Sequence, residues 1–218
     1  HSEYIFDIEY QSGIGEGSTF TTAFFPNFSE MNEFFNITGA GQEYNNPTQE
    51  LISLFVPGDT RKEVTVGVPG GFYDADSVFH ALPTSTNQTY TKKYFDSSPV
   101  RADSKANWKV IRYADVLLMY AEALNENGKP QQAIPFLNQV RTRAGLEGYP
   151  NTMSQTETRD AIVLERRLEL SFEGVRWFDL VRTGKAYEVM KDKGMAPYMT
   201  VFPIPLSQVQ IINDPTIF

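Results

Sequence analysis

Residues 110–124 carry apolar side chains at helical spacing on two sides of one helix. The first set, spaced three and four residues apart, comprises Val110, Ile111, Ala114, Leu117, Leu118, Ala121 and Leu124. The second set comprises Tyr113, Val116, Tyr120 and Ala123. A helix that covers one core has a single apolar stripe, so a helix with two stripes must pack against neighbours on both sides. The segment therefore predicts a multi-helix assembly.

A second helix is predicted directly after the first. Gly128 ends the first helix as a C-terminal cap, and Pro130 opens the second helix in its first turn. The second helix ends near Gly145, and its apolar residues are Ala133, Ile134, Phe136, Leu137 and Val140. The pair has the period of a tetratricopeptide repeat, about 34 residues, and small Ala121 and Ala133 where the two helices approach.

One such repeat is not enough for a stable stack, because repeats of this kind bury their apolar faces against each other and roughly three are needed. The neighbours are either the later helices of this chain or further repeats in an N-terminal portion that precedes it. We favour the second alternative. We therefore expect the chain alone to expose an adhesive apolar face or to self-associate.

Two more helices are predicted downstream. Ser154 to Glu157 has the pattern of a capping box, and the helix that it begins should run past Phe172 to Gly174. A shorter helix that contains Trp177 should end at Gly184. The prolines within 202–205 predict an extended segment, which a polar turn follows.

The part before the repeat is irregular. Alternation predicts one strand over residues 4–10 and another around 64–68, with a short helix between them at 47–56. From 69 to 107 the chain is rich in Gly, Ser, Thr, Asn, Asp and Tyr, and a connection that long is normally functional or disordered. We predict a mainly α fold, in which a tetratricopeptide-like repeat (108–145) packs with further helices beside an aromatic-rich region with short strands. The expected division is 1–107, which binds the ligand, and 108–218, which is helical.

Charge and composition argue against several functions. The net charge is −8, whereas nucleic acids and anionic membranes are bound by basic surfaces. No apolar run reaches the roughly 18 residues of a membrane span. The chain has no cysteine, and its histidines are His1 and His80. We therefore expect no thiolate or histidine metal centre, no Ser-His-Asp triad and no cofactor.

The charged residues at 165–182 are spaced three apart in several places, which indicates ion pairs that fix helix packing. A glycoside hydrolase would need two convergent carboxyls, and the spacing of Asp74, Asp76 and Asp103 singles out no such pair. Asp74 and Asp76 alone do not supply the roughly six to eight oxygens of a calcium site. Gly13 to Gly17 is interpreted as a flexible loop, because its spacing is not that of a nucleotide-binding motif. We expect no enzyme, and keep a hydrolase as a third hypothesis.

Aromatic side chains in polar loops remain as candidates for ligand binding. A sugar ring has an apolar face of C–H bonds that an aromatic ring covers, and a rim of hydroxyls that Asn, Asp or Gln satisfies. The same aromatics could instead attach long loops to a core. The candidate binding residues are Tyr44, Asn45, Phe72, Tyr73, Asp74 and Trp108.

The order and spacing of several blocks resemble the SusD/RagB family. The matching segments are 2–10, 57–61, 112–126, 137–145, 165–174, 176–184, 202–205 and 213–215. The resemblance implies the C-terminal portion of a longer lipoprotein, whose N-terminal part would hold further repeats and a lipid-modified cysteine.

The resemblance also implies a function. Such a protein binds an oligosaccharide or polysaccharide at the bacterial outer-membrane surface and delivers it to a SusC-like TonB-dependent transporter. The alternative is a helical-repeat module that binds a partner protein and has no sugar site of its own.

Overall fold

The structure is a computed structural model, and it describes residues 3–24, 26, 41–67, 71–73, 78–81, 89–94 and 102–212. The chain forms two compact units, His1–Glu173 and Gly174–Phe218, and each is described by itself. The functional division that we predict at 107/108 stays a prediction.

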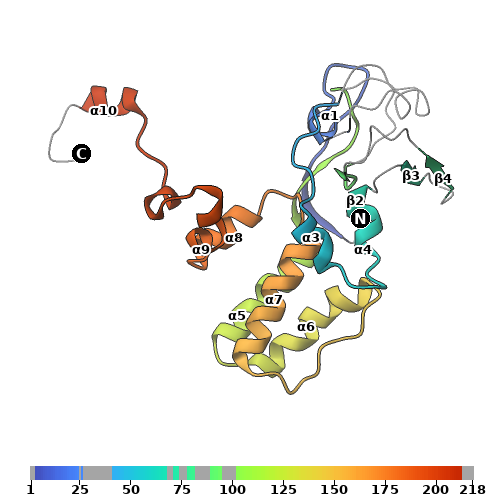
Figure 1. The fold of residues 1–218 in the computed structure, drawn as a ribbon, viewed down its shortest axis with the longest axis vertical. Helices are drawn as coiled ribbons and strands as arrows, with labels where there is room; N and C mark the ends of the chain where they lie inside the picture. The colour runs from blue at the N-terminus through green and yellow to red at the C-terminus, as the bar shows by residue number, and fades with distance from the viewer. Residues whose placement is uncertain are drawn as a thin grey trace. The chain divides into compact units, whose positions relative to one another are not determined.

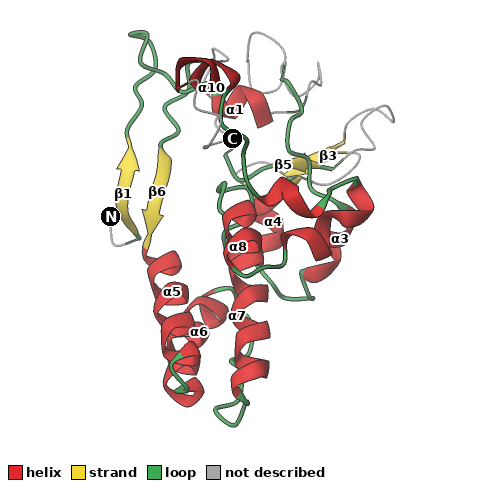
Figure 2. Ribbon diagram, turned by 90° about the vertical axis from the view of Figure 1, so that its left-hand side faces the viewer, coloured by secondary structure: helices red, strands yellow, loops and turns green. Residues whose placement is uncertain are grey.

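The first unit is built on three helices that lie side by side: α5 (Tyr113–Glu126), α6 (Pro130–Arg143) and α7 (Gln155–Glu169) (Figures 1 and 2). Their shared core is apolar and closed to solvent, and its most buried side chains are Leu118, Ala121, Ala133, Leu137 and Ile162. Gly128 has a φ of 72°, as the predicted cap between the two repeat helices requires. The predicted repeat is therefore confirmed, as is the mainly helical fold.

Helix α7 begins at the predicted capping box. The Ser154 hydroxyl accepts from the Glu157 N–H at 3.3 Å, and the Glu157 carboxylate accepts from the Ser154 N–H at 2.8 Å. The helix ends at Glu169, earlier than predicted. Phe172 has a φ of 66°, which a helix cannot contain, and the Lys93 ammonium donates to the carbonyls of Glu169 and Ser171 at 2.7 and 3.1 Å. These contacts stabilise the earlier end.

The predicted start of the first repeat helix is also wrong, at residues 108–112. They form a strand, β6 (Trp108–Arg112), which pairs antiparallel with β1 (Tyr4–Ile8), so Val110 and Ile111 are not helical. The strand predicted near the N-terminus is confirmed over 4–8. The chain changes from strand to helix at Arg112, and the next N–H, of Tyr113, donates to the Glu3 carbonyl at 2.8 Å.

Short elements complete the first unit. The predicted helix at 47–56 is confirmed as α3 (Gln49–Leu54). The strand expected around 64–68 is confirmed only over Val66–Gly67 (β2), because α4 (Arg61–Thr65) includes residues 64 and 65. The Asp59 carboxylate accepts from the Arg61 N–H at 3.0 Å and so favours a helical start. The other elements are α1 (Phe20–Phe24), β3 (Gly71–Tyr73), β4 (Phe79–Ala81) and β5 (Tyr90–Thr91). Strand β2 pairs with β5, and β3 with β4.

The second unit consists of short helices. They are α8 (Arg176–Arg182), α9 (Ala186–Met190), η2 (Lys191–Lys193), η3 (Pro197–Thr200) and α10 (Leu206–Ile212). Helix α8 was predicted, and 202–205, expected to be extended, is neither helix nor strand. Helix α10 replaces the predicted polar turn, since the Pro205 carbonyl accepts from the N–H groups of Gln208 and Val209. Within the described ranges, no helix is long and apolar enough to cross a membrane.

The second apolar stripe of α5 is largely exposed. Tyr113 and Tyr120 are 46% and 50% exposed, although the Tyr120 ring meets the edge of Phe136 at 4.7 Å between centroids. Met119, which the predicted set did not include, extends this exposed surface and is 46% exposed. Helix α7 packs on the other side of α5. The later helix therefore covers one face of the repeat, and the other remains available for a further element.

We expect the chain alone to self-associate through this stripe. Replacing both Tyr113 and Met119 with Lys should reduce the associated fraction, because the charge opposes apolar contact between copies. The free energy of unfolding should change by less than about 1 kcal/mol, since both sites are on the surface. Sedimentation velocity measures the first quantity, and urea unfolding the second. A wild-type chain that stays monomeric at high concentration would contradict the prediction.

Candidate functional site

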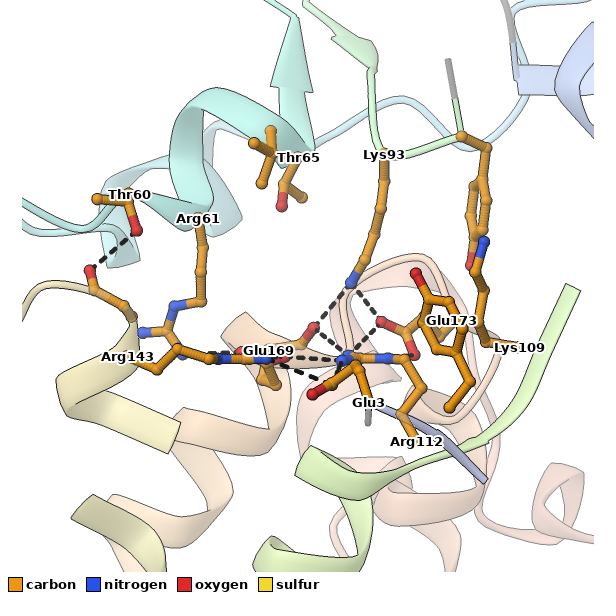
Figure 3. A pocket seen from close by; sticks show the side chains of 14 residues that line it. Glu3, Thr60, Arg61, Thr65, Lys93, Lys109, Arg112, Arg143, Glu169 and Glu173 are labelled. Carbon is orange, nitrogen blue, oxygen red and sulfur yellow. Dashed lines mark hydrogen bonds and ion pairs between the residues drawn. The ribbon is translucent and has the colours of Figure 1, made fainter. Parts of the chain in front are cut away.

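A cavity of about 430 Å³ lies between α4 and the C-terminal half of α7 (Figure 3). Helix α4 contributes Arg61 and Thr65, and the turn before residue 95 contributes Lys93 and Tyr94. The remaining walls come from β1, β6, the end of α6 and α7. Segments from across the first unit therefore converge here.

Two carboxylates of the α7 region form one wall. Glu173 accepts two hydrogen bonds from Arg112, at 2.7 and 2.8 Å, and forms an ion pair with Lys93. Oε1 of Glu169 accepts from Arg112 at 3.0 Å and from Arg143 at 2.5 Å. Figure 3 shows these side chains meeting along one side of the cavity. The wall therefore joins the end of β6 and the end of α6 to α7.

A second group of ion pairs lies behind Arg61. Its guanidinium donates to both oxygens of Asp59, at 2.9 and 2.7 Å, and to Oε2 of Glu165 at 2.8 Å. The other oxygen of Glu165 accepts from Arg141 at 2.8 Å, and the Glu165 side chain is 0% exposed. The two hydrogen bonds to Asp59 orient the guanidinium, and its hydrogen bond to Glu165 joins α4 to α7.

Burial and pairing shift several pKa values in this network. Desolvation alone would lower the pKa of Arg61 and Arg112, but hydrogen bonds and charges from their carboxylate partners outweigh it and raise both pKa values. Burial opposes ionisation of Glu169, yet Arg143, Arg112 and Lys93 together lower its pKa below 4.5. Burial is the main reason that the pKa of Lys93 is lowered. The arginines and Glu169 therefore stay charged at neutral pH.

The charges at 165–182 have the packing role that their spacing indicated. Arg182 contacts Asp179 at 2.8 Å, three residues away. Arg166 of α7 contacts Asp115 of α5 at 2.7 Å. Glu169 contacts arginines from other elements, which spacing within one helix could not show.

Trp108, one of the predicted binding residues, lies in an aromatic cluster beside the cavity. Its ring stacks on Tyr94, with centroids 5.4 Å apart and planes 20° apart. Phe20 of α1 meets both rings edge-on, at 5.3 and 5.2 Å. Because Tyr94 also lines the cavity, the cluster and the cavity share a wall. Trp108 is partly buried, and its ring packs against both Tyr94 and Phe20.

Tyr44 and Asn45 lie in an irregular segment before α3. The Tyr44 side chain is 59% exposed, while its N–H donates to the Ala23 carbonyl of α1 at 2.8 Å. Asn45 has a φ of 58°, and its carbonyl accepts from the Thr91 hydroxyl at 2.6 Å. These backbone contacts hold the segment in place and leave the Tyr44 ring in solvent.

The other predicted binding residues are described only in part. Phe72 and Tyr73 belong to β3, where they pair with His80 and Phe79 of β4. Asp74 lies outside the described residues. The role of all six residues in binding stays a prediction.

Sequence reasoning did not find the cavity. Its walls come from segments that run from Glu3 to Glu173, and the contact of Glu3 with Arg112 joins two of them across 109 residues. One signal was available: Glu165, Glu169 and Glu173 are spaced four apart, which places three carboxylates on one face of a helical segment. Among the residues with described positions, no group of three or more His, Asp or Glu could hold a metal ion.

The sequence profile of the SusD family matches residues 2–214. The chain belongs to the SusD family. SusD-like protein P38 of Formosa agariphila is 36% identical over 156 residues, which cover 68% of this chain and 28% of that protein. The SusD chain described here thus spans well under half of that relative.

Solved SusD-like structures share the fold. A laminarin-binding SusD-like protein matches with a TM-score of 0.71 and 30% identity, over 96% of this chain and 48% of that one. Surface glycan-binding protein A of Bacteroides thetaiotaomicron matches with a TM-score of 0.73 over 97% of this chain and 50% of that one, at 23% identity, which shows the fold alone. The mainly helical SusD-like architecture of this chain is therefore shared with experimental structures.

We expect the Glu169 ion pairs to be required for stability. Glu169→Gln removes one buried carboxylate partner of Arg112 and Arg143, although Glu173 still pairs with Arg112, so we expect a loss of about 1–3 kcal/mol of unfolding free energy. Glu126→Gln is the matched control, because the Glu126–Arg159 pair at 2.7 Å is on the surface and should contribute far less. Urea unfolding measures both. Equal effects of the two substitutions would show that burial does not matter here.

The same carboxylate should make stability depend on pH. Because the folded pKa of Glu169 lies below 4.5, its contribution is fully present above that pH and is lost as pH falls through the lower folded pKa. Glu169→Gln should therefore flatten the acid limb of a plot of unfolding free energy against pH. An unchanged acid limb in this variant would assign the effect to other carboxylates.

Proposed function

We propose that the chain is part of a non-catalytic glycan-binding protein of the bacterial cell surface. Membership of the SusD family over residues 2–214 carries this proposal. A relative named as a laminarin-binding SusD-like protein supports a saccharide ligand. The exposed Tyr44 side chain is suited to the C–H face of a sugar, and Trp108 is a partly buried aromatic residue.

The whole protein would deliver its glycan to a SusC-like TonB-dependent transporter. It would be held at the outer membrane by a lipid anchor in the N-terminal part of the longer protein. The irregular region before residue 108 would provide the ligand contacts, and the helices would provide a rigid base. This arrangement is common, because binding loops are positioned by a stable scaffold.

A second function is favoured by one observation. The exposed stripe of α5 has the helical spacing of a packing surface, and such a stripe suits a helical partner. A protein-interaction module without a sugar site would use this stripe alone. Glycan binding by the intact protein distinguishes the two functions, because the interaction module would bind no member of a broad glycan panel.

Tyr44→Ala should weaken glycan binding by about five- to tenfold, since one stacked aromatic contributes about 1 kcal/mol or slightly more. Tyr113→Ala is the matched control, because Tyr113 is similarly exposed but belongs to the α5 stripe. Isothermal titration calorimetry on the intact protein, with the glycan that binds best in the panel, gives both affinities. If Tyr113→Ala weakens glycan binding as much as Tyr44→Ala does, Tyr44 does not belong to the binding site.

Incubation with a labelled oligosaccharide should yield no cleavage product, because the proposal assigns binding without chemistry. Chromatography of the reducing ends detects turnover with high sensitivity. If a cleavage product forms reproducibly and is absent after heat inactivation of the protein, the protein is a hydrolase and the non-catalytic proposal is wrong.

A further inference from the structure

The lining of the cavity between α4 and α7 carries more positive than negative groups. Five cations face three carboxylates, and the eight side chains are Arg61, Lys93, Lys109, Arg112, Arg143, Glu3, Glu169 and Glu173. Two further carboxylates, Asp59 and Glu165, contact Arg61 from behind, and Glu165 also pairs with Arg141. The network thus holds six cations and five carboxylates, which leaves one positive charge in a chain whose net charge is −8.

The remaining charge is that of Lys109. Its ammonium donates to the Asn107 carbonyl at 2.9 Å and lies 5.2 Å from the centre of the Tyr4 ring. Within the described part of the chain it forms no ion pair, because the Asp7 carboxylate on the paired strand accepts from the Asn107 side chain at 3.2 Å instead. An ammonium has three donors, so two of those of Lys109 are left for a group in the cavity.

Partial burial makes an ammonium without a counter-charge unfavourable. Burial lowers the pKa of Lys109 and Arg112 adds to this effect, whereas the charges of Asp7 and Glu173 oppose it without reversing it. Each of the other four cations of the lining forms an ion pair with a carboxylate. An anion beside Lys109 would supply the missing counter-charge, and solvent would screen this pair less than a pair on the open surface.

The size and chemistry of the lining limit the kind of anion. A volume of about 430 Å³ exceeds that of a bare ion and is within the range of small-molecule pockets, roughly 300–1,000 Å³. Tyr4 is partly exposed and Val64 is 61% exposed, so both offer accessible apolar surface. A ligand with two negative charges would bring the second one into a lining that already has three carboxylates. An anion with one charge and an apolar body therefore fits best.

From these observations we propose that the cavity binds a small organic anion with one negative charge, whose carboxylate or sulfate oxygen accepts hydrogen bonds from the Lys109 ammonium. The apolar body of the anion lies beside Tyr4. Figure 3 places Lys109 at the Glu173 end of the carboxylate wall, away from Arg143. The site goes beyond the proposed glycan-binding function and does not require it, because a free carboxylic acid and the acidic group of a sugar present the same chemistry.

The test titrates the intact protein at low ionic strength with four small molecules. Acetate and benzoate are free carboxylates, glucuronate is an acidic sugar, and glucose is the neutral counterpart of glucuronate. Saturation-transfer NMR and isothermal titration calorimetry measure binding, and circular dichroism checks that each variant is folded.

Three variants and one control locate the bound anion. Lys109→Gln removes the charge, and Lys109→Arg keeps it. Val64→Trp fills the opening of the cavity and leaves every charged group in place. Lys105→Gln is the matched control, because it removes the same charge from an exposed residue that does not line the cavity.

We expect at least one of the three anions to bind the wild-type protein, and glucose to bind at least about tenfold more weakly than that anion. Lys109→Gln should weaken anion binding by about tenfold or more, because it removes a hydrogen bond between charged groups. Val64→Trp should have an effect of similar size, since it occupies the space of the ligand. Lys109→Arg should keep the affinity within about threefold, and Lys105→Gln within about twofold.

The other outcomes overturn the proposal or identify the source of the anion. If no anion binds the wild type at millimolar concentration, or if Lys109→Gln and Val64→Trp both bind as the wild type does, the cavity is not an anion site. If Lys105→Gln loses as much affinity as Lys109→Gln, a diffuse surface charge attracts the anion and the proposal is equally wrong. Binding of glucuronate alone supports an acidic sugar as the ligand, and binding of benzoate or acetate supports a free acid. Failure of the anion site leaves the proposed glycan-binding function standing, because the glycan panel tests that function separately.

Discussion

The carboxylates of Glu165 and Glu169 lie one turn apart on α7, inside the protein, and both are bound by arginines from other segments. Arg61 approaches from α4, Arg112 from the end of β6, and Arg141 from α6. Each buried charge costs several kcal/mol of desolvation, which is offset only when its partners are in place. The pairs therefore form together or not at all, and they fix the irregular region against the helices.

The walls of the cavity follow from the same contacts. Arg112 is the last residue of β6 and directly precedes α5, so its side chain enters the network where the backbone changes from strand to helix. Lys93 binds the carbonyls that α7 leaves free at its end, and so places Tyr94 beside Trp108. The residues that hold the fold together and the residues that line the cavity thus belong to one connected group. A substitution in the network should be analysed for stability before any loss of binding is assigned to contact.

Local patterns predicted the parts of this fold that local forces determine. Period, capping and glycine position located α6, α8 and the start of α7, because these signals act within a few residues. The strand at 108–112 was predicted as helix, since its partner is about a hundred residues upstream and its apolar residues continue the spacing of α5. Helix α4 was missed because the Asp59–Arg61 contact that starts it is stabilised by distant Glu165. The cavity likewise depends on contacts between distant segments. The sequence could therefore indicate aromatic residues in loops but not the cavity.

Buried ion pairs hold two regions together at a high cost in desolvation free energy. Apolar side chains of similar size often give equal or greater stability. Their advantage is geometric. The bidentate contacts of Arg61 with Asp59 and of Arg112 with Glu173 accept one arrangement, whereas an apolar surface tolerates sliding. Such contacts define positions most effectively in a region that has few buried elements and long loops. The network therefore fits a protein that must hold loop residues at set positions for a ligand, and this geometric need, more than stability, accounts for charges at the centre of the fold.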